Sequence, residues 1–369
     1  MRKCVWRGAR LWVVGLLVAA AWPSLAAAAG SPSGVTVFAG PPLQTPPPGI
    51  TRQADALFFY PRSVTIHTGQ SVTWQILGFH TVTFPGTKQP YPFVAASGKQ
   101  PRVRDASGHA FWWSGKVPVL SVSPFSILQQ GGDTLSDPSQ TASSGLLRVL
   151  TASPNQPPAP YTLTFPNAGV YHYQCAVHPG MHGVVIVKPW SVGTPAASTQ
   201  AAAAQAALQK TLADLKQLQT EKPKKPLTVF VGLGHNSTGA EVAAFSPSKL
   251  VVHVGDAVKF VNHDQTDIHT VTFGKPKTTG KIEKNFVAQR GQQILLSALG
   301  AYPSEPPGAP VTYDGGNHGN GYLNAGLLQP LDSPASAGPH SFTVTFTKKG
   351  TFHYECVIHP NMDGTIVVR

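Results

Sequence analysis

The stretch Tyr-His-Tyr-Gln-Cys-Ala-Val-His-Pro-Gly-Met (residues 171–181) has a second copy, Phe-His-Tyr-Glu-Cys-Val-Ile-His-Pro-Asn-Met, at residues 352–362. Each copy contains the pattern Cys-x-x-His-x-x-Met, so a thiol, an imidazole and a thioether lie within seven residues. These groups are soft or borderline metal ligands. With one more imidazole they form the His2Cys set with a weak axial Met that holds copper in blue copper centres. Each copy therefore predicts most of a copper site.

A shorter motif upstream of each copy supplies the missing imidazole. Phe-His-Thr-Val-Thr-Phe (residues 79–84) precedes the first copy, and Ile-His-Thr-Val-Thr-Phe (residues 268–273) precedes the second. Two complete sets of candidate ligands result. They are His80, Cys175, His178 and Met181 for the first site, and His269, Cys356, His359 and Met362 for the second.

The residues around each cysteine predict a strand that ends in a tight turn. Residues 171–175 and 352–356 read as strands. A proline follows each ligand histidine and favours extended backbone at that histidine. The next residue is Gly180 in one copy and Asn361 in the other. These residue types adopt positive φ most readily, so we expect a left-handed turn at both positions.

Further repeated segments predict a duplicated domain. Residues 35–40 match 227–232, residues 60–69 match 246–255, and residues 161–165 match 342–346. A chain of 369 residues is long enough for two domains of ordinary size. We therefore expect one domain at residues 31–190 and a second at residues 227–369.

The patterning within these domains is typical of an all-β protein. Apolar and polar residues alternate at residues 64–74 and 250–261, as in half-buried strands. The chain also contains 36 glycines and 35 prolines, which are typical of the turns between short strands. This predicts an antiparallel β-sandwich in each domain. Residues 85–160 and 274–340 show no clear period and are expected to be long loops with a few short strands, which could cover the copper end. Their aromatic side chains are expected to hold small apolar clusters together rather than to contact partners; these are Trp112, Trp113, Tyr313 and Tyr322.

One helix is expected, in the linker at residues 191–226. Thr194 and Pro195 are typical of a helix start, an Ala-rich run follows, and Pro223 ends the pattern. Leucines at positions 208, 212, 215 and 218 form a stripe that would pack on the protein's own domain or pair with a second chain as a coiled coil. The short stripe favours packing on the protein itself.

The first 30 residues have the pattern of a secretory signal peptide. Four basic residues precede an apolar run at residues 11–21, and small residues follow up to Gly30. A retained anchor is the alternative, but the apolar run is shorter than the roughly 20 residues that span a membrane. We therefore expect export to the periplasm, the cell envelope or the extracellular space.

Without the leader, Cys175 and Cys356 are the two cysteines of the chain. In an oxidising compartment a disulfide between them is the alternative to two metal thiolates. The identical spacing of His and Met after each cysteine favours the thiolates, because a disulfide would not require that coincidence.

The charge distribution limits the partners that this chain would bind. The formal net charge is +12, and the excess of basic residues lies in the leader, the first domain and the linker. Only 12% of residues are charged and no dense basic run occurs, so nucleic acid is not an expected partner. An acidic redox protein is a candidate partner, since the basic parts would steer it.

Taken together, these motifs resemble the cupredoxin family of plastocyanin- and azurin-like proteins, and the Cys-x-x-His-x-x-Met spacing is closest to the amicyanin type. The resemblance implies two tandem Greek-key β-sandwich domains, each with a type 1 copper ion held by the four residues named above. It also implies that the downstream histidine of each set, His178 or His359, is the electron gateway. Asn262, Asp264 and Asp267 lie just before the first ligand of the second site, whereas residues 75–79 contain no Asn or Asp. The surroundings of the two sites are therefore expected to differ.

Three function classes fit such a chain. An electron carrier without a small-molecule substrate is favoured, because four protein ligands leave no open position on the metal. A copper-binding or storage protein could use the same ligands. A copper nitrite reductase or laccase-like oxidase would need further His-ligated coppers, marked by His beside the ligand Cys or by His-x-His pairs. Gln174 and Glu355 precede the cysteines and no His-x-His occurs, so no enzyme is expected.

Overall fold

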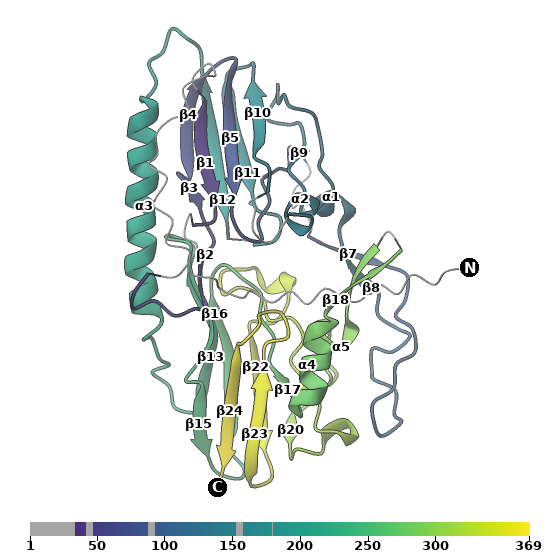
Figure 1. Cartoon of the computed structure of the whole chain (residues 1–369). Coiled ribbons are helices and arrows are strands. Elements are labelled where there is room, and N and C mark those ends of the chain that lie inside the picture. Colours follow the sequence, from purple (N-terminus) through teal and green to yellow (C-terminus); the bar gives the residue numbers. More distant parts are fainter. Residues whose placement is uncertain (1–33, 42–46, 88–92, 153–157, 179, 292) are drawn as a thin grey trace, which may run out of the picture. The chain divides into compact units, whose positions relative to one another are not determined.

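The chain folds into two β-sandwiches, which confirms the expected all-β class (Figure 1). The computed structural model describes residues 34–41, 47–87, 93–152, 158–178, 180–291 and 293–369. The expected leader at residues 1–30 and the proline at position 179 lie outside these ranges. Within them, no helix combines the length and the apolar character that crossing a membrane requires.

The first sandwich is built from strands whose side chains alternate between core and solvent. Its strands are β1 (Val35–Ala39), β3 (Phe59–Tyr60), β4 (Ser63–His67), β5 (Gln70–Ile76), β6 (Thr83–Phe84), β9 (Ala142–Ser143), β10 (Tyr161–Phe165), β11 (Gly169–Gln174) and β12 (His182–Lys188). Buried residues occupy every second position along β5 and β12. One sheet has the order β10-β5-β1-β3 and the other β4-β12-β11-β6-β9. The pairs β1–β5 and β4–β12 are parallel.

The second sandwich repeats this arrangement of strands. Its strands are β13 (Thr228–His235), β14 (Ala240–Ser246), β15 (Lys249–Val252), β16 (Ala257–Asp264), β17 (Thr272–Phe273), β20 (Thr312–Tyr313), β21 (Leu323–Asn324), β22 (Ser341–Phe346), β23 (Gly350–Glu355) and β24 (Asp363–Val368). One sheet contains β14-β13-β16-β22-β20, and the other has the order β15-β24-β23-β17-β21. The pairs β13–β16 and β15–β24 are parallel, like their counterparts in the first sandwich.

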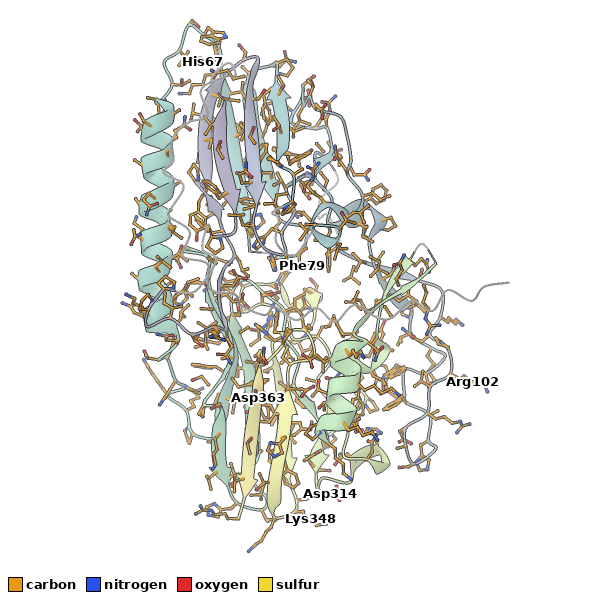
Figure 2. All side chains as sticks on the ribbon, viewed as in Figure 1. His67, Phe79, Arg102, Asp314, Lys348 and Asp363 are labelled. Carbon is orange, nitrogen blue, oxygen red and sulfur yellow. The ribbon has the colours of Figure 1, made fainter. Side chains whose placement is uncertain are left out.

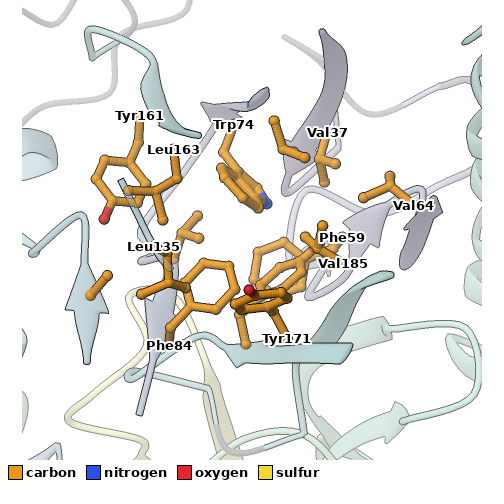
Figure 3. Packing of buried hydrophobic residues seen from close by; sticks show 14 of the residues in the cluster. Val37, Phe59, Val64, Trp74, Phe84, Leu135, Tyr161, Leu163, Tyr171 and Val185 are labelled. Atoms are coloured by element: carbon orange, nitrogen blue, oxygen red, sulfur yellow. The ribbon is translucent and has the colours of Figure 1, made fainter. Parts of the chain in front are cut away.

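Each sandwich encloses an aromatic core that reaches a ligand cysteine. In the first core Trp74 is fully buried, and its ring centroid lies 5.7 Å from that of Phe84 and 5.3 Å from that of Tyr173 (Figure 3). Cys175 and Met181 belong to the same buried cluster. The second core includes the cysteine and the methionine of its own motif in the same way. Both predicted sites therefore border a rigid apolar core.

The two halves of the chain share strands, which the sequence does not indicate. β2 (Ala54–Ala56), from the first half, pairs antiparallel with β14 at the edge of the second sandwich. The two long loops share one further sheet, made of β7 (Val94–Ser97), β8 (Val119–Val122), β19 (Gln293–Leu296) and β18 (Val287–Arg290). Because residues from Pro32 onward form one compact unit, the division into domains at residues 31–190 and 227–369 stays a prediction.

The long loops contain more regular structure than expected. Their helices are α1 (Pro124–Ile127), α2 (Leu147–Leu150), α4 (Pro276–Lys284), α5 (Ala298–Ala301), η1 (Asn317–Gly319) and η2 (Ala335–Ala337). Trp113 and Tyr322 are buried in one apolar cluster, against which Trp112 packs, whereas Tyr313 belongs to the main core of the second sandwich. As expected, these aromatic residues hold apolar clusters together. The first cluster also contains Val357, so it covers the ligand loop of the second site.

The linker forms helix α3 (Ala197–Leu218), which begins later than the sequence pattern suggested. Ala196 is the N-cap and makes no side-chain cap hydrogen bond, so Thr194 and Pro195 precede the helix. The leucine stripe packs against strands β1, β3 and β14 of this chain (Figure 1). Packing on the protein itself, one of the two alternatives for the stripe, is thereby confirmed. The hydroxyls of Tyr60 and Thr211 share a buried hydrogen bond of 2.7 Å in this interface.

We expect the substitution Leu208→Ala in α3 to destabilise the protein. Leu208 is 2% exposed and lies in a cluster with Phe58 and Tyr60, so its truncation leaves a cavity. The free energy of unfolding should fall by about 2–5 kcal/mol. Chemical denaturation of the copper-free protein would measure the change. Gln209→Ala, at the exposed neighbouring position, is the control and should change stability by less than about 0.5 kcal/mol. Equal stability of the two variants would show that α3 does not pack as described.

Candidate metal centres

The first candidate site lies where β11 ends and the chain turns toward β12. Gln174 of β11 pairs with Thr83 of β6, which brings the segment before β6 beside the turn. Phe79, the neighbour of His80, lies at one end of the first sandwich and His67 at the other (Figure 2). The predicted ligands therefore reach one end of the sandwich from two different segments.

The ligand atoms of the first site converge. The Nδ1 atoms of His80 and His178 are 3.0 Å apart, and the Sγ atom of Cys175 is 3.6 Å from Nδ1 of His178. One potential ligand atom from each of these residues lies within 4.8 Å of the other two. All three side chains are buried, with exposed fractions of 7% or less.

The second candidate site has nearly the same geometry. The Nδ1 atoms of His269 and His359 are 3.0 Å apart, and Sγ of Cys356 is 3.6 Å from Nδ1 of His359. His269 and Cys356 are buried, and His359 is partly exposed. The structure thus brings together six of the eight predicted ligands in two groups of three.

Two main-chain hydrogen bonds close each ligand loop and bury its methionine. The amide of Cys175 donates to the carbonyl of Met181 over 2.9 Å, and the amide of Met181 donates to the carbonyl of His178 over 3.0 Å. The second loop makes the same two bonds, at 2.9 and 3.3 Å. Met181 and Met362 are 0% and 1% exposed. An axial role for both methionines remains a prediction.

The turn after each histidine was expected to need positive φ. Asn361 has a φ of 64°, which confirms the prediction for the second loop. Gly180 directly follows position 179, which lies outside the described residues, and its expected left-handed conformation stays a prediction. A Cβ atom at Gly180 would come within 3.1 Å of the Cα atom of Thr266, so this loop lies against the second sandwich.

The ionisation of the ligand groups fits a soft cation. Burial by itself would raise the pKa of the Cys175 thiol, but the charge of His178 and hydrogen bonds from His178 and His80 hold it well below the usual value. Burial would lower the pKa of His178, but the Cys175 thiolate raises it to about 9. These two pKa shifts both favour an imidazolium beside a thiolate. A metal ion that displaces the imidazolium proton finds both ligands in the form it requires.

The cysteine sulfur also accepts a main-chain hydrogen bond in both sites. The amide of Thr81 lies 3.3 Å from Sγ of Cys175, and the amide of Thr270 lies 3.4 Å from Sγ of Cys356. Such bonds stabilise a thiolate and tune the potential of a copper ion bound to it. The residues present therefore fit copper, with a thiolate, two imidazoles and a buried thioether in each half.

Two glycines that sequence reasoning missed make room for the upstream histidines. Gly40 (φ +88°) follows β1, and a Cβ there would lie 2.8 Å from Cδ2 and Nε2 of His80. Gly232 (φ +68°) lies at a β-bulge in β13, and a Cβ there would collide with the imidazole of His269. The signal was present in the sequence, because both glycines end matched segments, at residues 35–40 and 227–232.

The surroundings of the two upstream histidines differ as expected. The Nε2 atom of His269 donates to a carboxylate oxygen of Asp264 at 3.3 Å. The second carboxylate oxygen of Asp264 accepts the amides of Thr266 and Asp267, at 2.6 and 3.2 Å. The Nε2 atom of His80 is buried and has no hydrogen-bond partner among the described residues. Asp264 thus orients the second site, and the first lacks an equivalent carboxylate on this histidine.

Two further carboxylates lie beside the second site. Asp267 accepts a hydrogen bond from Nε2 of His359 at 3.1 Å. Burial would raise the pKa of Asp267, but the hydrogen bond and charge of His359 hold it well below its usual value. Glu241 is 3% exposed, and burial together with the charges of Asp264 and Asp267 raises its pKa to about 8. Its Oε1 has no hydrogen-bond partner in the described part of the chain, and the sequence analysis did not identify it.

The alternative of a disulfide is wrong, because Cys175 and Cys356 are both free and buried in separate sites.

The other histidines of the two motifs point away from the ligands. His172 and His353 are exposed on their strands, and so is His182 after the first loop. His67 stacks on Trp190 with ring centroids 4.2 Å apart. None of these four side chains belongs to the His-Cys-His group of either candidate site.

Comparisons with known proteins give little further information. No family model and no curated protein matches the chain. Similar solved structures include the Cu(I) form of an amicyanin mutant, 18% identical over 40% of this chain and 87% of that chain, with a TM-score of 0.22. Another is amicyanin from Paracoccus versutus, 15% identical over 40% of this chain and 86% of that chain, with a TM-score of 0.22. Values this low carry no argument about family or function.

We expect Cys175→Ser and Cys356→Ser each to remove one copper ion and about half of the visible thiolate-to-copper absorbance. The double variant should lose both ions and all of the colour, because each thiolate is the strongest ligand of its own site. Metal analysis and visible spectra of the copper-loaded proteins would measure this. Full colour in either single variant would show that only the other half is a functional copper site.

We expect Asp264→Asn to weaken copper binding at the second site about 10- to 100-fold and to leave the first site unchanged. An Asn can keep its oxygen on the two amides, but its amide group would then face the N–H of His269. Competition with a chelator, followed through the visible band, would measure the affinities. Asp256→Asn is the matched control, because Asp256 accepts the amide of His253 in the turn before β16. Unchanged affinity in Asp264→Asn would contradict the orienting role.

Proposed function

We propose that this chain is an exported blue copper protein of cupredoxin type, which binds two type 1 copper ions and transfers single electrons between protein partners. The observation that carries the proposal is the convergence of a buried cysteine sulfur and two Nδ1 atoms in each half. The first site would be held by His80, Cys175, His178 and Met181, and the second by His269, Cys356, His359 and Met362. Copper would supply a Cu(II)/Cu(I) couple at each site.

The chain's own groups suit electron transfer better than catalysis. The ligand loops are closed by main-chain hydrogen bonds, so the ligands need little movement when the charge of the metal changes. A set of four protein ligands leaves no position for a substrate. Among the described residues, the two remaining groups of potential metal ligands consist of carboxylates around His269 and His359. A cluster of several histidines, as a nitrite reductase or laccase-like oxidase would need, is not among them.

A copper-storage protein remains the second candidate, and the burial of the sites bears on it. Cys175 and Cys356 are each 1% exposed, so both thiols lie well inside the protein, although His359 is partly exposed. A storage protein must give up its metal, and release from such sites would require the loops to open. Fast electron exchange does not require the ligand loops to open. The electron carrier is therefore the better proposal.

The partner is proposed to be a redox protein with an acidic surface. The first half and the linker carry the net positive charge of the mature chain, which would steer such a partner by long-range attraction. The rate of reaction should then fall as salt increases. Export, which rests on the pattern of the first 30 residues, is part of the same proposal.

We expect the copper-loaded, reduced protein to be reoxidised rapidly by a small oxidant and to consume neither oxygen nor nitrite catalytically. The reason is that protein ligands saturate the metal. An oxygen electrode, a nitrite assay and stopped-flow absorbance would measure the three rates. The double variant Cys175→Ser and Cys356→Ser, loaded in the same way, is the control for adventitious copper. Catalytic turnover of either substrate that the control lacks would overturn the carrier assignment.

A further inference from the structure

We propose that the two copper sites exchange electrons within one chain, where the loop of His178 lies against the segment of Thr266 and Asp267 beside His359. The inference rests on the proposed function and deepens it. In addition to a partner protein, each copper site would have the other copper site as a redox partner. One electron would leave the couple at the second site and enter the couple at the first. The reverse step restores the starting state. No bond is made or broken, and no proton is required.

The first step of the argument is that the ligand loop of the first site lies against the second sandwich. A Cβ atom at Gly180 would collide with the side chain of Asn236 and would come within 3.1 Å of the Cα atom of Thr266. Gly180 follows His178 by two residues, and Thr266 precedes Asp267 by one. The absence of a side chain at position 180 therefore permits a close approach of backbone to backbone between the two sites.

The second step is the orientation of the histidines at this contact. Nδ1 of His178 and Nδ1 of His359 face their own cysteines, at 3.6 Å from Sγ in each case. The opposite nitrogen of His359, Nε2, donates to Asp267 at 3.1 Å. Asp267 directly follows Thr266, the residue against which Gly180 of the first ligand loop lies. His178 itself is only 7% exposed. Asp267 thus contacts the outer nitrogen of His359, in the segment of the second half that lies against the loop of His178.

The third step is that the contact is held in place by structure outside the sites. Strand β2 from the first half is hydrogen-bonded to β14 of the second sandwich. Gln53, just before β2, donates from Nε2 to the carbonyl of Asn361 in the second ligand loop at 3.2 Å. The amide of Thr51 donates to the side-chain oxygen of Gln219, the C-cap of α3, at 3.0 Å. Electron tunnelling falls steeply with distance, so a fixed contact favours exchange within the chain over exchange between chains.

The fourth step gives the exchange a direction. Asp264 and Asp267 accept hydrogen bonds from the outer nitrogens of both histidines of the second site. Negative charge and more basic ligands stabilise Cu(II) relative to Cu(I). The Nε2 atom of His80 has no such partner among the residues described. The second site is therefore expected to have the lower reduction potential, so a single electron should come to rest at the first site.

The test uses the full chain loaded with two copper ions and reduced by one electron per chain in a rapid pulse. Freeze-quench EPR would identify the site that stays Cu(II), with Cys175→Ser and Cys356→Ser as the two reference spectra. We expect the signal to become that of the second site, at a rate independent of protein concentration. A concentration-dependent rate, or a remaining signal from the first site, would overturn the proposal.

Two variants probe the contact itself. Asp267→Ala should slow the intrachain step about tenfold or more, whereas Asp314→Ala, in an exposed turn before η1, should not change it. Gly180→Ala would bring a Cβ against Asn236 and Thr266 of the second half and should widen the contact, with Gly193→Ala as the matched control, since a Cβ at Gly193 would meet no atom within 4 Å. If Asp267→Ala does not fold or load copper, the rate of the intrachain step in Gly180→Ala is the test of the contact. An unchanged rate in that variant would refute the proposal.

A second readout does not depend on electron transfer. Dipolar EPR of the fully oxidised protein should give one narrow distance between the two Cu(II) ions, which becomes longer or broader in Gly180→Ala but not in Gly193→Ala. A broad distribution in the unaltered protein would contradict a fixed contact. Absence of copper would refute the proposed function as a whole. Two functional coppers that exchange electrons only between chains would refute the inference alone.

Discussion

Both sites depend on the closure of the loop that follows each cysteine. The amide of the cysteine donates to the carbonyl of the methionine six residues later, and the amide of that methionine donates to the carbonyl of the ligand histidine. These bonds join main-chain groups, so they do not require metal. They fix a thiol, an imidazole and a thioether at the border of an apolar core, and the upstream histidine then completes the set. The candidate ligand atoms are thus positioned by the fold itself, without a metal ion.

Positioning polar groups in this way has a cost that the core has to offset. Two imidazole nitrogens only 3.0 Å apart and a thiolate are buried in each site, and buried charge is unfavourable unless it is paired. The imidazolium–thiolate pair supplies the pairing in the metal-free protein, and hydrogen bonds from Thr81 and Thr270 to sulfur assist it. The cysteine and the methionine of each site also pack in an apolar core, around Trp74 in the first and around Phe273 in the second.

The same ligand set is placed in two different surroundings. At the second site three carboxylates lie behind the histidines, and one of them, Glu241, is on a strand whose partner comes from the other half of the chain. In the pairing of β14 with β2, Glu241 is opposite Asp55. Strand β2 of the first half therefore covers the edge of β14 at Glu241. Duplication of one fold can thus yield two unequal sites, because the surroundings are set by contacts that the two halves do not share.

The sequence alone identified the candidate ligands, because the same residues recur at the same spacing in two copies, and the structure brings six of the eight together in two groups of three. The sequence also determined the all-β class and the existence of the linker helix, since both follow from periodicity. Only the tertiary structure decided where α3 starts, that α4 forms and that β2 pairs with the second sandwich. It also decided that Gly40 and Gly232 lie against the upstream histidines. The same holds for the contact between the loop of His178 and Thr266. These features depend on contacts between residues far apart in the chain. Such contacts are governed by packing, so local sequence patterns do not predict which distant segments will meet.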